Sequence, residues 1–126
     1  MKIALIDVPI VSAKESKKDI PSLTLGYLGA ALLSAGHTVF LLDTARWKKS
    51  YESCYEEIIS QRPEAIGFTC TTLTRFVTIN LIKKIKTIYS PLVIVGGCHF
   101  TFTAKDALEK VGEIDIVVRG EGEETI

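Results

Sequence analysis

The chain has no excess of charge of either sign. Its 126 residues contain 15 Lys and Arg against 15 Asp and Glu, so the formal net charge at pH 7 is zero. Binding to DNA, RNA or an anionic membrane surface depends mainly on clustered positive charge. We therefore expect no nucleic-acid partner and no membrane partner, and the composition favours a small molecule or another protein domain.

Long apolar segments and paired cysteines are also lacking. The apolar run at the N-terminus stops at Asp7 and Pro9, which is too short for a membrane span or for the apolar part of a signal peptide. The three cysteines, Cys54, Cys70 and Cys98, are odd in number and widely spaced, without a CxxC pair. We interpret them as free thiols, which predicts a reducing, cytoplasmic location.

The glycine-rich phosphate loops of nucleotide-binding proteins are absent as well. Neither GxGxxG nor GxxxxGK[ST] follows the first apolar segment, which argues against a dinucleotide or triphosphate site. Asp7 has no acidic neighbour, so the acidic cluster of a phosphate-accepting receiver domain is missing. No repeat or linker interrupts the chain, and its length and 47% hydrophobic fraction fit one globular domain over residues 1–126.

The sequence does contain an alternation of strand and helix patterns. Continuous apolar or β-branched runs, typical of strands covered on both faces of a parallel sheet, occupy residues 2–7, 38–43, 65–70, 92–95 and 115–118. Helical patterns fill residues 22–35, 50–62, about 76 to 90, and 104–110. This rhythm predicts an α/β fold, a three-layer, doubly wound parallel sheet of five strands. The final RGEGEETI has the pattern of a first turn of a fifth helix, and we expect the chain to be part of a longer protein.

The loops at the carboxyl ends of the strands hold the candidate site residues, because ligands of open parallel sheets bind there. After the third strand, Thr69, Thr71 and Thr72 supply hydroxyls, which suit either a polar pocket or the capping of the next helix. After the fourth strand, Gly96 and Gly97 suit either close approach of a nucleotide-like group to the backbone or only a tight turn. The residues themselves leave both alternatives open.

Cys98, His99 and Glu121 are the reactive residue types in these loops. A catalytic pair of Cys98 and His99 is disfavoured because adjacent residues usually point apart. We interpret His99 as a polar wall of a pocket and His37 as structural. Glu121 lies between two glycines at the end of the fifth strand, where it is well placed to meet a ligand.

Four segments together resemble one protein family. PSLTLGYLGAALLSAGHTVFLLD, IGFTCTTLT, IVGGCHFT and DIVVRGEGEET occur in the order and spacing seen in the amino-terminal cobalamin (B12)-binding domains of B12-dependent radical SAM enzymes. The most specific part is the pair GG-x-H-x-T and GEGEE, separated by a short helix and an apolar strand. The resemblance covers nearly the whole chain and implies a flavodoxin-like (Rossmann-like) domain with strand order 2-1-3-4-5.

The resemblance also implies where cobalamin would be bound. The nucleotide tail of the cofactor would lie between sheet and helices, with the corrin ring across the carboxyl ends of the strands. Thr69 and Thr71 would line the tail pocket. Gly96 and Gly97 would allow close approach of the tail, and Glu121 would hydrogen-bond on its far side. The full set of expected cofactor-binding residues is Pro9, Thr69, Thr71, Thr72, Gly96, Gly97, His99, Thr101, Gly120, Glu121 and Gly122.

Two absences bear on the reaction. B12 domains that place a protein histidine below the cobalt carry D-x-H-x-x-G after the first strand, whereas here VPIVSA follows Asp7 and no histidine precedes His37. The resemblance therefore implies base-off cobalamin without a histidine ligand. The CxxxCxxC ligands of a radical SAM [4Fe-4S] cluster are also missing. The cluster and S-adenosylmethionine are expected in a downstream radical SAM domain of the same chain, which would be the protein partner.

We expect this chain alone to catalyse nothing and the parent protein to be a methyltransferase or a related radical cyclase or rearrangement enzyme. Two alternatives come from other classes. One is a degenerate flavodoxin-like scaffold or interaction domain that no longer binds a cofactor, and the other is an FMN or nucleotide binder.

Overall fold

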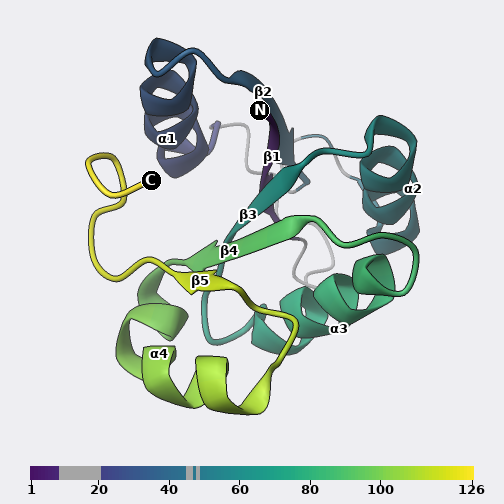
Figure 1. Ribbon diagram of the computed structural model, residues 1–126, viewed down its shortest axis with the longest axis vertical. Coiled ribbons are helices and arrows are strands. Elements are labelled where there is room, and N and C mark those ends of the chain that lie inside the picture. The colour runs from purple at the N-terminus through teal and green to yellow at the C-terminus, as the bar shows by residue number, and fades with distance from the viewer. Residues whose placement is uncertain (9–20, 45–46, 48) are drawn as a thin grey trace.

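A computed structural model describes residues 1–8, 21–44, 47 and 49–126 of the chain. Figure 1 shows helices on both sides of a central sheet. In chain order the elements are β1 (Lys2–Asp7), α1 (Leu23–Ser34), β2 (Thr38–Asp43), α2 (Tyr51–Gln61), β3 (Ala65–Thr69), α3 (Arg75–Lys86), β4 (Leu92–Gly96), α4 (Cys98–Lys110) and β5 (Ile116–Val117).

The five strands form one parallel sheet in the order β2-β1-β3-β4-β5. Asp7 pairs in register with Asp43 on one side and with Thr69 on the other, and Thr69 pairs with Gly96. The strands therefore end together at one edge of the sheet. The predicted α/β fold and strand order are confirmed.

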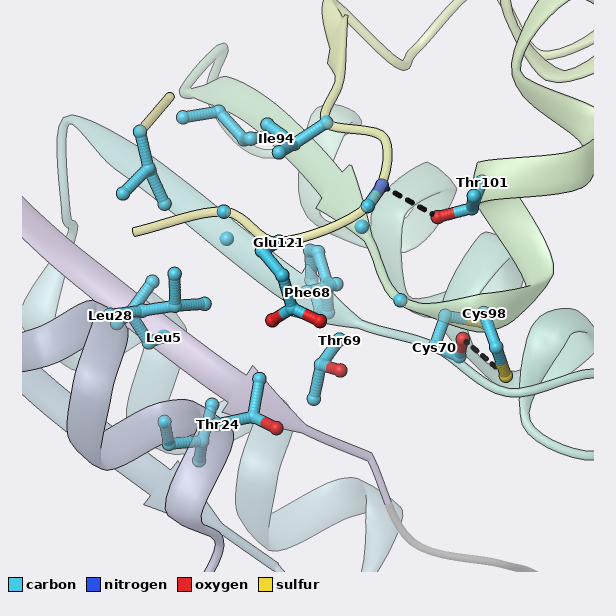
Figure 2. A pocket seen from close by; sticks show the side chains of 18 of the residues that line it. Leu5, Thr24, Leu28, Phe68, Thr69, Cys70, Ile94, Cys98, Thr101 and Glu121 are labelled. Atoms are coloured by element: carbon cyan, nitrogen blue, oxygen red, sulfur yellow. Dashed lines mark hydrogen bonds between the residues drawn. The ribbon is translucent and has the colours of Figure 1, made fainter. Parts of the chain in front are cut away.

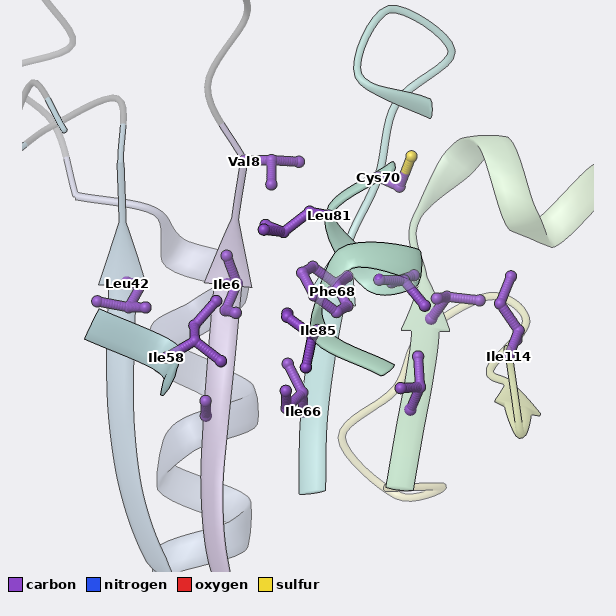
Figure 3. Packing of buried hydrophobic residues seen from close by; sticks show 14 of the residues in the cluster. Ile6, Val8, Leu42, Ile58, Ile66, Phe68, Cys70, Leu81, Ile85 and Ile114 are labelled. Atoms are coloured by element: carbon purple, nitrogen blue, oxygen red, sulfur yellow. The ribbon is translucent and has the colours of Figure 1, made fainter. Parts of the chain in front are cut away.

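Two apolar clusters hold the helices on opposite faces of the sheet. On one face, α1 buries Leu25 and Leu32 against Ile3 and Leu5 of β1. The larger cluster on the other face, seen in Figure 3, combines the sheet with α2, α3 and α4. Its buried members include Ile6, Leu42, Ile58, Ile66, Phe68, Leu81, Ile85, Val95, Phe100 and Ala107.

The ends of the first two helices follow local signals in the sequence. The hydroxyls of Ser22 and Ser50 accept hydrogen bonds from backbone N–H groups three residues on, at 3.4 and 3.1 Å. After α1, Gly36 adopts a φ of 87°, and after α2, Arg62 adopts a φ of 42° directly before Pro63. These residues end each helix sharply.

Some predicted boundaries were wrong. β3, β4 and β5 differ from prediction by one residue at one or both ends. The fourth helix begins at Cys98 rather than at Ala104, because Gly97 with its φ of 94° turns the chain directly into it. Irregular backbone at Thr103 divides this helix, and the predicted range is only its second part. At the C-terminus, the Ile126 N–H donates to the Gly122 carbonyl at 2.9 Å, so the last residues form a single turn, in agreement with the turn expected from RGEGEETI.

Candidate functional site

A cavity of about 630 Å³ lies on the α1 face of the sheet, at the carboxyl half of the strands. One wall is α1, and the other is the C-terminal segment, residues 119–126, which returns toward α1 in Figure 1. Figure 2 shows side chains from these walls and from the sheet facing one space. The residues that line the cavity include Leu5, Thr24, Leu28, Gly67, Thr69, Ile94, Gly96, Thr101, Glu121 and Gly122.

The floor of the cavity is low because two glycines on neighbouring strands line it, Gly67 paired in register with Ile94 and Gly96 with Thr69. Gly67 and Gly96 sit on β3 and β4 and leave backbone exposed where other residues would project a side chain. A Cβ at Gly67 would lie 2.7 Å from Leu5 Cδ2, so the Leu5 side chain on β1 would have to shift to admit one. A Cβ at Gly96 would lie 3.5 Å from the Val118 carbonyl oxygen, which is an ordinary contact. Gly96 therefore keeps space open that a side chain could physically fill.

Gly97 is required by the chain itself. Its φ of 94° is unfavourable for residues with a side chain, and an added Cβ would lie 2.6 Å from the carbonyl oxygen and 2.8 Å from the nitrogen of Cys70. Hydrogen bonds draw this turn onto Cys70, whose N–H donates to Gly96 O at 3.0 Å and whose carbonyl accepts from His99 N at 3.3 Å. The tight-turn interpretation of Gly97 thus has a specific physical basis, although the residue also borders the cavity.

The predicted threonines have different environments. Thr69, at the end of β3, lines the cavity. Thr71 also borders it, but its N–H donates to Thr74 Oγ1 at 3.1 Å and its hydroxyl lies 3.3 Å from the same oxygen. Thr72 is not among the lining residues, and its Oγ1 lies 3.4 Å from His99 Nδ1. Thr69 is the best placed of the three to meet a ligand, whereas Thr71 and Thr72 organise the turn before α3.

His99 and Cys98 occupy the first turn of α4. His99 does not line the cavity, and its ring lies edge-on to Phe100 with centroids 5.2 Å apart. Burial, and to a smaller degree the nearby Arg75 guanidinium, lowers the pKa of His99 below 6.5. Cys98 borders the cavity, and its Sγ lies 3.9 Å from Cys70 O. In the described structure no hydrogen bond joins Cys98 to His99.

The C-terminal segment brings a carboxylate to the cavity. Figure 2 shows the Glu121 side chain directed into the cavity on the side of Thr69 and Thr24. Thr101 of α4 accepts a hydrogen bond from the Gly120 N–H at 3.1 Å through its hydroxyl oxygen. Gly122 packs against α1, since a Cβ there would lie 3.0 Å from Leu28 Cδ2. These contacts bring the predicted site residues that precede β5 and those that follow it around the same cavity.

The sequence interpretation missed the wall formed by α1 and the glycine in β3. Thr24, Tyr27 and Leu28 line the cavity from α1, and Gly67 forms its floor. The available signal for Thr24 was its place in the first turn of a helix that begins at the carboxyl edge of the sheet. Pro9, the remaining predicted residue, lies outside the described residues.

The described part of the chain offers no protein-only metal centre, because it contains no group of three or more His, Cys, Asp or Glu side chains that could hold an ion. Within the same residues, every helix is too short or too polar to span a bilayer. The cavity instead combines an apolar floor and wall with hydroxyls and the two acidic residues Glu121 and Glu123. Such a lining suits an organic ligand that has an apolar part and several hydrogen-bonding groups.

Comparison with known proteins points to one family. The family model described as a B12 binding domain matches residues 10–126. The chain is 32% identical over 108 residues to an anaerobic magnesium-protoporphyrin IX monomethyl ester cyclase of Cereibacter sphaeroides, covering 84% of this chain and 18% of that protein. It is 33% identical over 128 residues to an uncharacterized methyltransferase of Pyrococcus horikoshii, covering 99% of this chain and 28% of that protein. The chain thus spans less than a third of these relatives.

Solved structures share the fold. The cobalamin-dependent S-adenosylmethionine radical enzyme OxsB, with aqua-cobalamin and S-adenosylmethionine bound, matches with a TM-score of 0.81 and 17% identity, over 98% of this chain and 17% of that one. RosB, solved with a bound riboflavin-phosphate intermediate, matches with a TM-score of 0.52 and 10% identity, over 95% of this chain and 64% of that one. At these identities the two structures support the fold alone.

Proposed function

The chain belongs to the B12-binding domain family, and from this premise we propose that it binds cobalamin, with the nucleotide tail in the cavity between α1 and the C-terminal segment. The observation that carries the proposal is that cavity. Its volume of about 630 Å³ falls within the range of small-molecule and cofactor sites, and its floor is the glycine backbone of β3 and β4.

The residues around the cavity suit a nucleotide tail. Gly67 and Gly96 provide a flat backbone surface against which a planar base can lie, and Ile94 and Leu28 extend this surface with apolar side chains. The hydroxyl of Thr69 can form hydrogen bonds with a ligand, and so can Thr24 of α1 and Glu121 of the C-terminal segment. A ribose and a phosphodiester need such partners when they leave water.

Glu121 is the acceptor that we assign to a hydroxyl of the tail. A carboxylate accepts hydrogen bonds from hydroxyl groups, and Glu121 is directed into the cavity from the segment opposite α1. Thr69 and Thr24 approach from the other side, where their hydroxyls can donate to or accept from the ligand. The resulting contacts would orient the tail so that the corrin lies at the carboxyl edge of the sheet.

We further propose that bound cobalamin is base-off and has no histidine ligand from this chain. The sequence has two histidines, and neither faces the cavity. His37 Nδ1 lies 3.2 Å from the N-terminal amine of Met1, at the opposite edge of the sheet. His99 contacts Thr72 and Phe100 instead. The loop after β1, which follows Asp7, contains no histidine.

The parent protein is proposed to be a cytoplasmic B12-dependent radical SAM enzyme, either a methyltransferase or a related cyclase or rearrangement enzyme. Cobalamin would supply a cobalt centre for that chemistry, and a [4Fe-4S] cluster and S-adenosylmethionine would be bound by a radical SAM domain beyond these residues. The names of the curated relatives, which include cyclases and a methyltransferase, support this choice. In this scheme the chain binds and orients the cofactor.

Cobalamin binding can be tested directly on the 126-residue protein. Hydroxocobalamin is added, free cofactor is removed by gel filtration, and the visible spectrum of the protein fraction is recorded. We expect corrin absorbance to co-elute with the protein at close to one equivalent. A parallel sample with FMN tests the flavin alternative. Absence of retained corrin at micromolar protein would reject the proposal, and absence of both ligands would favour the scaffold alternative.

A further inference from the structure

Two parts of the chain that are far apart in sequence order meet at Thr101. The first is the start of α4, directly after the glycine pair Gly96-Gly97. The second is the C-terminal segment, which leaves the sheet after the two-residue strand β5. Two hydrogen bonds join them: the Gly120 N–H donates to Thr101 Oγ1 at 3.1 Å, and Arg119 Nε donates to the Thr101 carbonyl oxygen at 3.1 Å. Figure 2 shows the first of these next to Glu121.

The segment before Glu121 has few other attachments. The pairing of β5 with β4 ends with the bond from Val118 N to Val95 O at 2.8 Å. Beyond it, the hydrogen bonds among the described residues that join residues 119–121 to the rest of the domain are the two at Thr101. Gly120 has a φ of 71° and thereby reverses the chain direction. The position of Glu121 therefore depends on where Thr101 holds the residue before it.

We propose that Thr101 is a positioning residue, which holds the C-terminal segment so that the Glu121 carboxylate is directed into the cavity. Thr101 acts on the ligand through Glu121. This inference rests on the proposed function, because it assigns Glu121 to ligand binding. A threonine suits the task, since one side-chain oxygen accepts from the Gly120 N–H while the backbone carbonyl of the same residue accepts from Arg119.

The test compares three variants with the unsubstituted protein. Thr101→Val keeps the shape of the side chain and removes the acceptor, whereas Thr101→Ser keeps the acceptor. Thr103→Val is the matched control. It removes a hydroxyl from the same helix, where Thr103 Oγ1 donates to the His99 carbonyl at 2.9 Å. Thr103 does not line the cavity.

The first measurement is the rate of amide hydrogen exchange at Gly120, which is recorded by NMR in the absence of ligand. We expect exchange to become roughly threefold to tenfold faster in Thr101→Val, as the loss of one hydrogen bond implies. Thr101→Ser and Thr103→Val should leave it unchanged. Unaltered exchange at Gly120 in Thr101→Val would overturn the inference, whatever the ligand does.

The second measurement is the dissociation constant for hydroxocobalamin, with and without Glu121→Gln. Thr101→Val should weaken binding roughly threefold to tenfold in the parent background and have no further effect when Glu121 is already substituted. Equal effects in both backgrounds would show that Thr101 acts independently of Glu121 and would reject the positioning role. If the unsubstituted protein binds no cobalamin, the proposed function fails and the ligand role of Thr101 fails with it, while the exchange data still report whether the hydrogen bond holds the segment.

Discussion

Gly96 ends β4 and Gly97 follows it, and replacing each of them with alanine, one at a time, should produce opposite effects on stability. At Gly97, alanine must adopt a φ of 94°, which costs about 1–2 kcal/mol. Its Cβ would also lie 2.6 Å from Cys70 O and 2.8 Å from Cys70 N, and relieving such overlap costs about 1–3 kcal/mol. The sum of about 2–5 kcal/mol is a large share of the roughly 5–15 kcal/mol by which domains of this kind are stable.

At Gly96 the same substitution should leave the fold intact and lower the affinity of the protein for its ligand. The added Cβ would lie 3.5 Å from Val118 O, so no atom has to move. Loss of backbone freedom in the unfolded chain should even stabilise the variant by about 0.4–1 kcal/mol. The methyl group would stand on the cavity floor, however, and overlap there of about 1–3 kcal/mol corresponds to a roughly fivefold to hundredfold weaker affinity for cobalamin.

The assay combines urea unfolding, followed by circular dichroism, with hydroxocobalamin titration of each folded variant. Gly112→Ala is the matched control, because an added Cβ at Gly112 meets no atom within 4 Å. We expect Gly97→Ala to shift the unfolding midpoint to lower urea, and Gly96→Ala to shift it slightly to higher urea, while the control should not lower it. Undiminished cobalamin affinity in Gly96→Ala would refute the assignment of Gly96 to the ligand floor. A Gly97→Ala variant as stable as the parent would contradict the geometry of the turn.

Three further predictions concern the cofactor, the thiols and acid stability. Cob(II)alamin bound to the chain should give an EPR spectrum without nitrogen superhyperfine splitting, and an axial-nitrogen triplet would contradict the absence of a histidine ligand. Iodoacetamide at pH 8 should modify exposed Cys98, more slowly once cobalamin is bound, and should spare Cys54, because burial raises the pKa of that thiol to about 11 despite nearby Lys49; equal labelling in mass spectrometry would refute this. Burial opposes ionisation of Asp115, but its bonds from Val93 N and the Lys86 ammonium hold the pKa of that carboxyl below 3.8. A depressed pKa contributes stability that is present above about pH 3.8 and lost as the pH falls through the folded-state value. Asp115→Asn should therefore lower the stability at pH 7 and reduce the loss of stability between pH 7 and acid, as urea unfolding at a series of pH values would measure.

Much of the fold could be predicted because strands buried in a parallel sheet have a simple sequence pattern, a continuous run of apolar residues. Residues 2–7 and 38–43 are continuous apolar runs, and both became strands with those boundaries. Ser50 and Pro63 marked the limits of α2 correctly, because a cap and a proline act within one turn of their own position. These signals are local, and local physics is sufficient to place them.

The start of α4 could not be predicted in the same way. CHFT after the glycine pair has the composition of a loop, and its helical state depends on the turn at Gly97 being held against Cys70 of a different loop. Phe100 is buried against the core of the opposite face, which stabilises that first turn. A contact between residues about thirty positions apart decides the local conformation.

The part of the candidate site that consists of motif residues could be predicted from the sequence. The part that depends on how distant elements pack together could not. Thr69, Gly96, Thr101 and Glu121 were identified from their loops, and all of them line one cavity. Gly67 was missed because the sequence does not show which side chain lies next to a glycine inside a strand. The structure shows that this neighbour is Leu5 of β1. The α1 wall was missed for the same reason, since its contribution depends on the position of the C-terminal segment.

The motifs GG-x-H-x-T and GEGEE form one structural unit, and several of their residues have an identifiable structural role. Gly97 allows the turn, and His99 lies 3.4 Å from the Thr72 hydroxyl, which links this turn to the loop before α3. Thr101, the last residue of the first motif, accepts from Gly120, the first residue of the second. The distance between the motifs in sequence is therefore set by α4 and β5, which must return the chain to the point where it entered the helix. Most residues of the two motifs line the cavity, whereas His99 and Phe100 lie outside its lining and hold the first turn of α4 against the loop before α3 and the core.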